Sequence, residues 1–416
     1  MKKYKKLLAA ALAICSVSTV ANAASYQLND YSVTNMGRSY AGQGIVGDDY
    51  SAIAYNPAAM TLKEKSGLQQ VFNMIGVDSD VYGIDDHNDQ KGEMKFWQAV
   101  PAGFAQYNVN EKFSLGAGIY APYGLKTKYK RDWFGSDAAI LSKLDIVDFN
   151  LSGAYKLDEH WSIGASAIVR YIYGRMTQTV STAIGGGDVN FNVHGWSQTG
   201  TLGLMYEFDE KSRVGLSYRL RSAQRAKGRY KTSNPSLLGM MSAAGSDAVN
   251  ANPDLPETIT FSAYKRIKKF GFSGTARWTH WTSSFPDFTI RSAGIPGGEK
   301  KTLYDYQNTW SLAAGADYYY TKETTFRAGV GYDESPTHKP ERRTIRIPDS
   351  DRWWISAGAS YVMDNWQFDV AYSHLIAKTS KSTEDQGIPN YNVPGVHAKY
   401  KHTFSNIIGA QVQYSF

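Results

Sequence analysis

The sequence has little cysteine and, beyond its first two dozen residues, lacks long apolar runs. Cys15 is the only cysteine among 416 residues, and it lies in a stretch that we expect to be removed. The mature chain should therefore contain no thiol and no disulfide. Because the bulky Ile14 precedes Cys15, we expect no lipid anchor either. After residue 23 no stretch approaches 18 consecutive apolar residues, which excludes helical membrane spans.

The first 23 residues have the features of a secretory signal peptide. Four lysines occur within the first six residues, a mostly apolar run follows over residues 7–20, and Ala21-Asn22-Ala23 forms a small-x-small site. An N-terminal membrane anchor is disfavoured because the apolar run is shorter than the roughly 20 residues that a spanning helix needs. We expect cleavage after Ala23.

The sequence also lacks a strong charge of one sign and clustered catalytic or metal-binding motifs. Removing the four lysines of the leader leaves 45 − 4 = 41 basic against 38 acidic residues, a net charge of 41 − 38 = +3. That small excess, without clustered basic runs, does not indicate nucleic acid as a partner. The eight histidines show no metal-ligand spacing, and no motif calls for a catalytic site. We therefore expect no enzyme, no metal and no cofactor.

Aromatic residues and glycine are abundant instead, with 29 Tyr, 17 Phe, 10 Trp and 38 Gly. This mixture is typical of strands that meet a lipid interface. At the end of the chain, apolar residues from Ile408 to Phe416 alternate with small or polar ones, and the last residue is aromatic. Such an ending resembles the C-terminal signal that outer-membrane barrels present to the barrel assembly machinery. The last strand of a soluble sheet could end in the same way.

Alternation with a period of two recurs along the chain. Residues 149–157 and 214–221 each place apolar side chains on one strand face and small, polar or charged ones on the other. The pattern predicts an all-β fold, a transmembrane antiparallel β-barrel of about 14 strands. We expect strands near 67–77, 97–108, 113–120, 146–157, 161–177, 190–208, 212–230, 257–266, 269–285, 301–320, 324–333, 351–363, 366–377 and 399–416.

Two kinds of connection separate these strands, which predicts their sidedness. Compact polar links should be periplasmic turns; they lie at 108–112, 157–160, 209–212, 321–324 and 363–365. Longer stretches rich in Gly, Pro, Ser and Asn should lie outside the cell; they cover 121–145, 180–195, 222–256, 285–304, 334–350 and 377–394.

Residues 24–65 show little strict alternation and precede the first predicted strand. Patterning alone leaves two arrangements open: a flexible periplasmic tail, or a segment that folds back and plugs the barrel. The predicted organisation is thus a signal peptide at 1–23, an N-terminal segment at 24–65 and a barrel at 66–416.

Short motifs in the same order resemble the FadL family of outer-membrane transporters of long-chain fatty acids and other hydrophobic compounds. The resemblance extends over nearly the whole mature chain. It rests on Tyr26-Gln-Leu-Asn29, Gly37-Arg-Ser-Tyr-Ala-Gly42, Asn56-Pro-Ala-Ala-Met-Thr61, Asn150-Leu-Ser-Gly-Ala-Tyr155, Leu255-Pro-Glu257, Thr279 with Trp281, Asp333-Glu-Ser-Pro336, Ile347-Pro-Asp-Ser-Asp-Arg352 and Ser356-Ala-Gly358.

The resemblance implies a 14-stranded barrel closed by an N-terminal hatch. Ligand is captured among the extracellular loops, passes to a lumenal pocket and leaves sideways through a gap in the wall, by diffusion. The family also includes importers of aromatic hydrocarbons, so the substrate stays open between long-chain fatty acids and such hydrocarbons.

An apolar run in the polar 222–256 loop predicts a ligand-landing surface, because methionine adapts to varied ligand shapes. Its residues are Leu237, Leu238, Met240 and Met241. The alternative is that these side chains form a small core among the loops, and both roles are compatible.

The resemblance also assigns roles near the hatch and in the lumen. Asn56 and Pro57 would seat the hatch, although Asn-Pro is also a common structural corner. Tyr26 would contact lumenal ligand. The family's basic pocket residues match positions near Gln178 and Thr302 here, so Arg175 and Lys301 are substitutes for binding a carboxylate. The alternative for both is a solvated charge on the barrel wall.

The sequence is therefore compatible with three classes of function. A hydrophobic-substrate transporter predicts a plugged barrel, a general porin predicts an open polar lumen, and a surface adhesin or receptor would place function in the long loops. We expect a monomer in the outer membrane, in contact with membrane lipid and lipopolysaccharide, because a closed barrel satisfies its own edges.

Overall fold

The computed structural model describes residues 26–85, 88–182, 185–233, 249–251, 254–283, 287–291, 299–384 and 395–416. Within these residues fourteen long strands form a closed antiparallel barrel. Each strand pairs with the next, and β1 pairs with β19 to close the ring. In order around the wall the strands are β1 (Gly67–Gly83), β2 (Lys91–Asn108), β3 (Phe113–Lys128), β4 (Leu141–Lys156), β5 (Trp161–Thr182), β6 (Gly185–Asp209), β7 (Ser212–Arg219), β10 (Thr258–Ile267), β11 (Phe270–Thr279), β14 (Thr309–Tyr319), β15 (Thr324–Asp333), β16 (Arg352–Met363), β17 (Trp366–Ala377) and β19 (Val396–Ser415).

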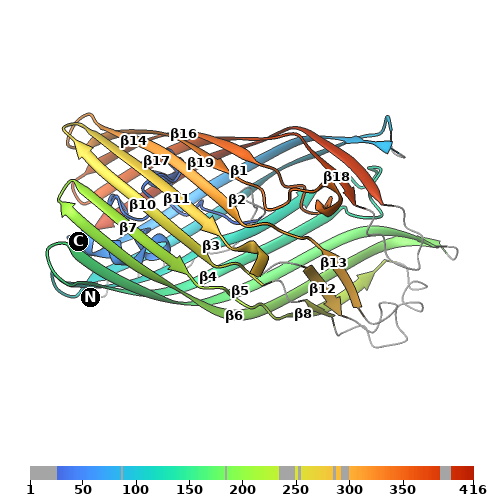
Figure 1. Cartoon of the computed structure of the whole chain (residues 1–416), viewed down its shortest axis with the longest axis horizontal. Helices are drawn as coiled ribbons and strands as arrows, with labels where there is room; N and C mark the ends of the chain where they lie inside the picture. Colours follow the sequence, from blue (N-terminus) through green and yellow to red (C-terminus); the bar gives the residue numbers. More distant parts are fainter. Residues whose placement is uncertain are drawn as a thin grey trace.

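Short strands extend the wall at the end opposite the C-terminus, on the right in Figure 1. They are β8 (Ala226–Thr232), β9 (Val249–Ala251), β12 (Asp287–Arg291), β13 (Glu299–Leu303) and β18 (Ser380–Glu384), with the 3-10 turns η3 (Trp281–Ser283) and η4 (Pro340–Arg342) beside them. The predicted strands 212–230 and 301–320 are each broken in two by this arrangement, and the predicted strand 269–285 ends early, at Thr279, before η3. The predicted count of fourteen wall strands is confirmed.

The two faces of the wall have opposite chemistry. Apolar side chains on the predicted face, such as Phe149, Leu151 and Leu216, point outward and are exposed. Charged side chains on the other face, such as Arg170 and Asp317, are buried inside. This is the reverse of a soluble protein, in which large exposed apolar surfaces are rare. The outer surface therefore requires a lipid environment. None of the helices in the described part of the chain is long and apolar enough to cross a membrane.

Tight hairpins join the strands at the end where the C-terminus lies (Figure 1), including all five links predicted as compact turns. In the β4–β5 turn, the Asp158 carboxylate accepts backbone hydrogen bonds from Trp161 at 2.7 Å and His160 at 2.8 Å. These bonds favour the ionised carboxylate and so lower the pKa of Asp158. An acidic turn residue thus ties the hairpin by its side chain.

Several predicted loops contain strand residues, namely 121–145, 180–195, 222–256, 285–304 and 377–394, and the largest departure is at 180–195. Residues 180–195 were expected outside the cell as a connection, yet β5 and β6 remain paired as far as Thr182 and Gly185. Strands that extend beyond the bilayer need no apolar face, so their sequence loses the alternation that predicts a strand while the backbone ladder continues.

The N-terminal segment, residues 26–66, lies inside the barrel. It contains the short helices α2 (Val33–Gly37) and α3 (Ala52–Tyr55) and the 3-10 turn η1 (Pro57–Leu62). Nearly all of its residues up to Met60 are buried. Of the two arrangements that patterning left open, the structure has the segment folded back into the lumen.

Buried ion pairs tie this segment to the wall. Arg38 contacts Asp48 at 2.7 Å and Asp317 of β14 at 3.0 Å. Arg327 of β15 contacts the same two carboxylates, at 3.0 Å and 3.3 Å. Two arginines and two aspartates therefore form one neutral cluster, which we call the Arg38 cluster, shared by the segment and two wall strands.

Candidate functional site

The wall is interrupted between β2 and β3. Strand β2 pairs with β1 over almost its full length, from Lys91 to Gln106. With β3 it pairs only from Gly103 to Asn108. Beyond this point the described backbone has a single further bridge between the two strands, Met94 with Tyr129. The hydrogen-bonded ladder with β3 is thus missing over about two thirds of β2, although β2 remains paired with β1 and β3 with β4.

A bulge in β3 causes the interruption. The pairing of β3 with β4 shifts between Tyr120 and Tyr123, so that Ala121 and Pro122 together face one residue of β4. A bulge bends its strand, and proline has no N–H to donate to a ladder. Strand β3 therefore turns away from β2 at Pro122.

The bent part of β3 pairs with the start of the N-terminal segment instead. Gly124 N–H donates to Tyr26 O at 2.8 Å, and Leu28 N–H donates to Pro122 O at 2.8 Å. Gln27 lies opposite Tyr123 in this short bridge. The interrupted wall and the lumenal segment are therefore joined, because the segment satisfies two of the β3 backbone groups that β2 leaves unpaired.

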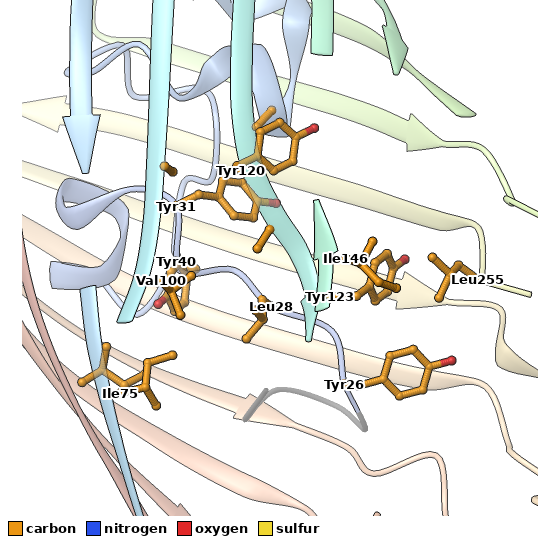
Figure 2. Close-up of a cluster of buried hydrophobic side chains, with 14 of the residues drawn as sticks. Tyr26, Leu28, Tyr31, Tyr40, Ile75, Val100, Tyr120, Tyr123, Ile146 and Leu255 are labelled. Carbon is orange, nitrogen blue, oxygen red and sulfur yellow. The ribbon is translucent and has the colours of Figure 1, made fainter. Parts of the chain in front are cut away.

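Aromatic side chains fill the interior around this bridge. Figure 2 shows Tyr26, Leu28, Tyr31, Tyr120 and Tyr123 gathered beside the strands. The Tyr26 ring packs edge-on against Trp281 with centroids 5.3 Å apart, and Tyr31 lies 4.8 Å from Tyr120. Tyr26, predicted to contact lumenal ligand, is thus placed inside the barrel at the interrupted wall.

A small cavity lies between the segment and the wall. Its volume is about 30 Å³, enough for about one or two water molecules and too small for an acyl chain. Most of its lining residues are polar; they are Gln27, Leu28, Asn29, Tyr31, Gln43, Ala54, Tyr55, Pro122, Tyr123, Thr201, Ser217, Arg219, Thr258, Thr260 and Arg277. An extended ligand can enter this cavity only if the segment or its side chains move.

Asn56 and Pro57 seat the other end of the segment. The Asn56 Oδ1 atom accepts from Ala58 N–H at 3.1 Å and begins η1, while its Nδ2 donates to Leu204 O of β6 at 3.2 Å. Gly164 and Gly203 lie opposite one another on β5 and β6. A Cβ at Gly203 would lie 2.2 Å from Asn56 Oδ1, so glycine is required for this close contact. The corner is structural and also joins the segment to the wall.

Comparison with known proteins supplies the family. The family model described as "Outer membrane protein transport protein (OMPP1/FadL/TodX)" matches residues 14–416. The chain belongs to the OMPP1/FadL/TodX family. It is 29% identical to the long-chain fatty acid transport protein of Escherichia coli O6:H1, covering 92% of this chain and 94% of that one. It is 28% identical to outer membrane protein P1 of Haemophilus influenzae over the whole of both chains.

Solved structures share the fold of this FadL-family protein. A Pseudomonas aeruginosa FadL homologue superposes with a TM-score of 0.83 at 24% identity, covering 94% of this chain and all of that one. The Pseudomonas putida toluene transporter TodX superposes with a TM-score of 0.69 at 14% identity, covering 94% and 99%. The chain is an outer-membrane transport protein for hydrophobic compounds, and these likenesses leave its particular substrate open.

The remaining predicted site residues of this FadL-family barrel are not gathered in its interior. Arg175 lies on the face of β5 that carries Trp161 and Ile163 outward; it is exposed and donates to Asn190 at 3.3 Å. Lys301 of β13 is exposed as well. The register of β5 therefore points Arg175 away from the lumen, and we do not carry either residue forward as a ligand contact. Leu237, Leu238, Met240 and Met241 lie outside the described residues.

Two buried arginines beside the cavity, Arg219 of β7 and Arg277 of β11, were not predicted from the sequence. Arg219 contacts Asp148 at 3.3 Å and donates to Tyr120 Oη at 3.2 Å. In both strands apolar side chains alternate with small or polar ones, and both arginines lie on the small and polar face. Their position in this alternation could have distinguished them from Arg175, which lies on the apolar face of its strand.

Proposed function

We propose that this FadL-family protein carries long-chain fatty acids across the outer membrane by diffusion, with exit through the wall between β2 and β3. The observation that carries the proposal is the coincidence of two features: the wall loses its β2–β3 ladder at the place where the N-terminal segment pairs with bent β3. Motion of residues 26–28 would therefore change the wall and the lumen together.

A continuous apolar route is needed for such a ligand. Burial of each methylene contributes about 0.8 kcal/mol, so a chain of about 16 methylenes gains roughly 13 kcal/mol in all when it leaves water. Re-exposure of this chain to water midway would cost a large part of that gain. Sideways exit into the bilayer avoids re-exposure, because the outer surface of the wall is apolar.

Long-chain fatty acids are favoured over aromatic hydrocarbons by the curated relatives. The Escherichia coli and Salmonella typhi proteins at 29% and 28% identity are both long-chain fatty acid transport proteins, and each match covers at least 90% of this chain. The toluene transporter TodX is less similar in sequence, at 14% identity. In the proposed route the apolar loop residues Leu237, Leu238, Met240 and Met241 capture the ligand, and Tyr26 contacts it in the lumen.

A reversible crosslink tests the route. Gln27 and Tyr123 face one another as a pair without direct hydrogen bonds, a geometry that brings Cα atoms to about 4.5 Å and permits a disulfide. Cells that lack their own transporter would express the wild type or Gln27→Cys/Tyr123→Cys at equal surface abundance. Uptake of labelled oleate and of toluene would then be measured before and after reduction.

We expect the wild type to take up oleate, the oxidised double variant to lose uptake, and reduction to restore it. The two single-cysteine variants are the controls and should behave as wild type under both conditions. Uptake by the oxidised variant equal to the wild type would refute motion of the segment. Uptake of toluene alone would refute the fatty-acid substrate, and uptake of neither compound would refute transport and favour a role as surface adhesin or receptor.

A further inference from the structure

A group of polar atoms beside the cavity has no role in the structure described so far. Arg277 is buried on the inner face of β11, and within the described residues its guanidinium has no carboxylate at ion-pair distance. It donates one side-chain hydrogen bond, from Nη2 to Gln43 Oε1 at 2.5 Å. A buried arginine is usually paired with an acid, because burial of an uncompensated charge is costly.

Among the described residues, two further donors beside the same cavity have no partner. The Gln43 Nε2 and Thr201 Oγ1 atoms are buried and make no hydrogen bond. The backbone of Gln43 is held against the wall, since its N–H donates to Thr275 Oγ1 at 3.2 Å and its carbonyl accepts from Ser262 Oγ at 3.2 Å. With Oε1 facing Arg277, the amide presents Nε2 as an unused donor. Unsatisfied buried donors are rare, and each one indicates a missing acceptor.

The charge balance of the lining points to an anionic acceptor. The lining contains Arg219 and Arg277 and no Asp or Glu. Arg219 shares Asp148 with Arg170, which already holds that carboxylate by two bonds at 2.6 and 2.8 Å. Two arginines thus share one carboxylate, while Arg277 has none. The lining of the cavity therefore carries an excess of positive charge.

We propose that Arg277, with Gln43 Nε2 and Thr201 Oγ1, binds the carboxylate head of a fatty acid during transit and selects acids over neutral compounds. This inference rests on the proposed function and adds its specificity. Three donors suit a carboxylate, which is acceptor-only and forms strong charge-assisted bonds with arginine. A neutral hydrocarbon satisfies none of them. The cavity has room for a head group, and the tail requires movement of Leu28 and Tyr31, which also line it.

Paired ligands of one chain length test the site. Binding of oleate and of oleyl alcohol would be measured on the purified full-length protein in a nonionic detergent, for the wild type, Arg277→Met and Gln43→Glu. Gln43→Glu preserves the side-chain shape and supplies Arg277 with a carboxylate in place of the ligand. Arg266→Met is the matched control, because Arg266 is an exposed arginine stacked 3.8 Å from the Tyr319 ring centroid, outside the cavity lining.

We expect oleate affinity to fall about tenfold to a hundredfold in both cavity variants, the loss typical of a hydrogen bond to a charged group. Oleyl alcohol affinity should stay within about twofold of the wild type. Arg277→Lys should recover part of the oleate affinity, since it restores the charge without the planar fork. The Arg266→Met control should bind both ligands as the wild type does.

Equal losses for both ligands, or unchanged oleate binding in Arg277→Met, would overturn the assignment. Heat-modifiable electrophoretic mobility would report whether each variant barrel is folded. If Arg277→Met does not fold, the oleate affinity of Gln43→Glu tests the site. A wild type that binds oleyl alcohol as tightly as oleate would overturn the site and leave transport intact. A wild type that binds neither would refute the proposed function itself.

Discussion

The Arg38 cluster should hold the N-terminal segment in the lumen, and Asp317→Asn is the most direct test. The substitution keeps the shape of the side chain and removes one of two carboxylates that neutralise Arg38 and Arg327. The side chains of Arg38 and Asp317 are both 0% exposed and 3.0 Å apart. Loss of one partner from a buried pair costs about 3–5 kcal/mol, because the other charge is left uncompensated.

That cost should appear as local opening of the segment. Each 1.36 kcal/mol is a factor of ten in an equilibrium constant, so opening should increase between about a hundredfold and a few thousandfold. Amide hydrogen exchange, measured on the protein in detergent, would report it as lost protection of α2 and the residues up to Asp48. The wall strands should keep their protection, since their ladders do not depend on this cluster.

A double-mutant cycle supplies the critical control. Arg38→Gln combined with Asp317→Asn leaves Asp48 paired with Arg327, so the double variant should be protected better than Asp317→Asn alone. Asp305→Asn is the matched exposed control; its pair with Lys339 is about half exposed and should contribute at most about 1 kcal/mol. Amide exchange in Asp317→Asn equal to that of the wild type would refute a stabilising role of the Arg38 cluster. Strictly additive effects of the two substitutions in the double-mutant cycle would refute it as well.

Two further substitutions test the seat of the segment and the outer surface. Gly203→Val should force Asn56 and Ala58 from the wall, since even a Cβ at this position would lie 2.8 Å from the Ala58 nitrogen. Overpacking of this kind costs about 1–3 kcal/mol of stability. Unchanged amide hydrogen exchange across η1 would contradict this prediction. Leu151→Arg places a charge on the outer face of β4, where Leu151 is 68% exposed. It should destabilise the barrel in lipid vesicles by up to about 2–4 kcal/mol in urea titrations, whereas Glu111→Arg, at an exposed position in the β2–β3 turn, should have little effect.

The sequence by itself determined the strands, their number and the direction of their faces. Alternation with a period of two is a local property, so residues such as Leu151 and Leu216 predict an outward apolar face before any pairing is known. Compact turns and longer connections likewise predicted which end of the barrel carries the hairpins. Prediction failed at 180–195, where the strands continue beyond the membrane and no apolar face is required.

Only the tertiary structure decided what the interior contains. Arg38 and Asp317 are 279 residues apart, and closure of the barrel brings them within a hydrogen bond of each other. The same holds for Gln43 and Arg277, 234 residues apart. From the sequence, Arg175 and Lys301 were offered as substitutes for the lumenal cations, with solvated wall charges as the alternative, and both side chains are exposed. Long-range contacts of this kind depend on register and closure, which local periodicity does not encode, and they determine which charges meet inside the lumen.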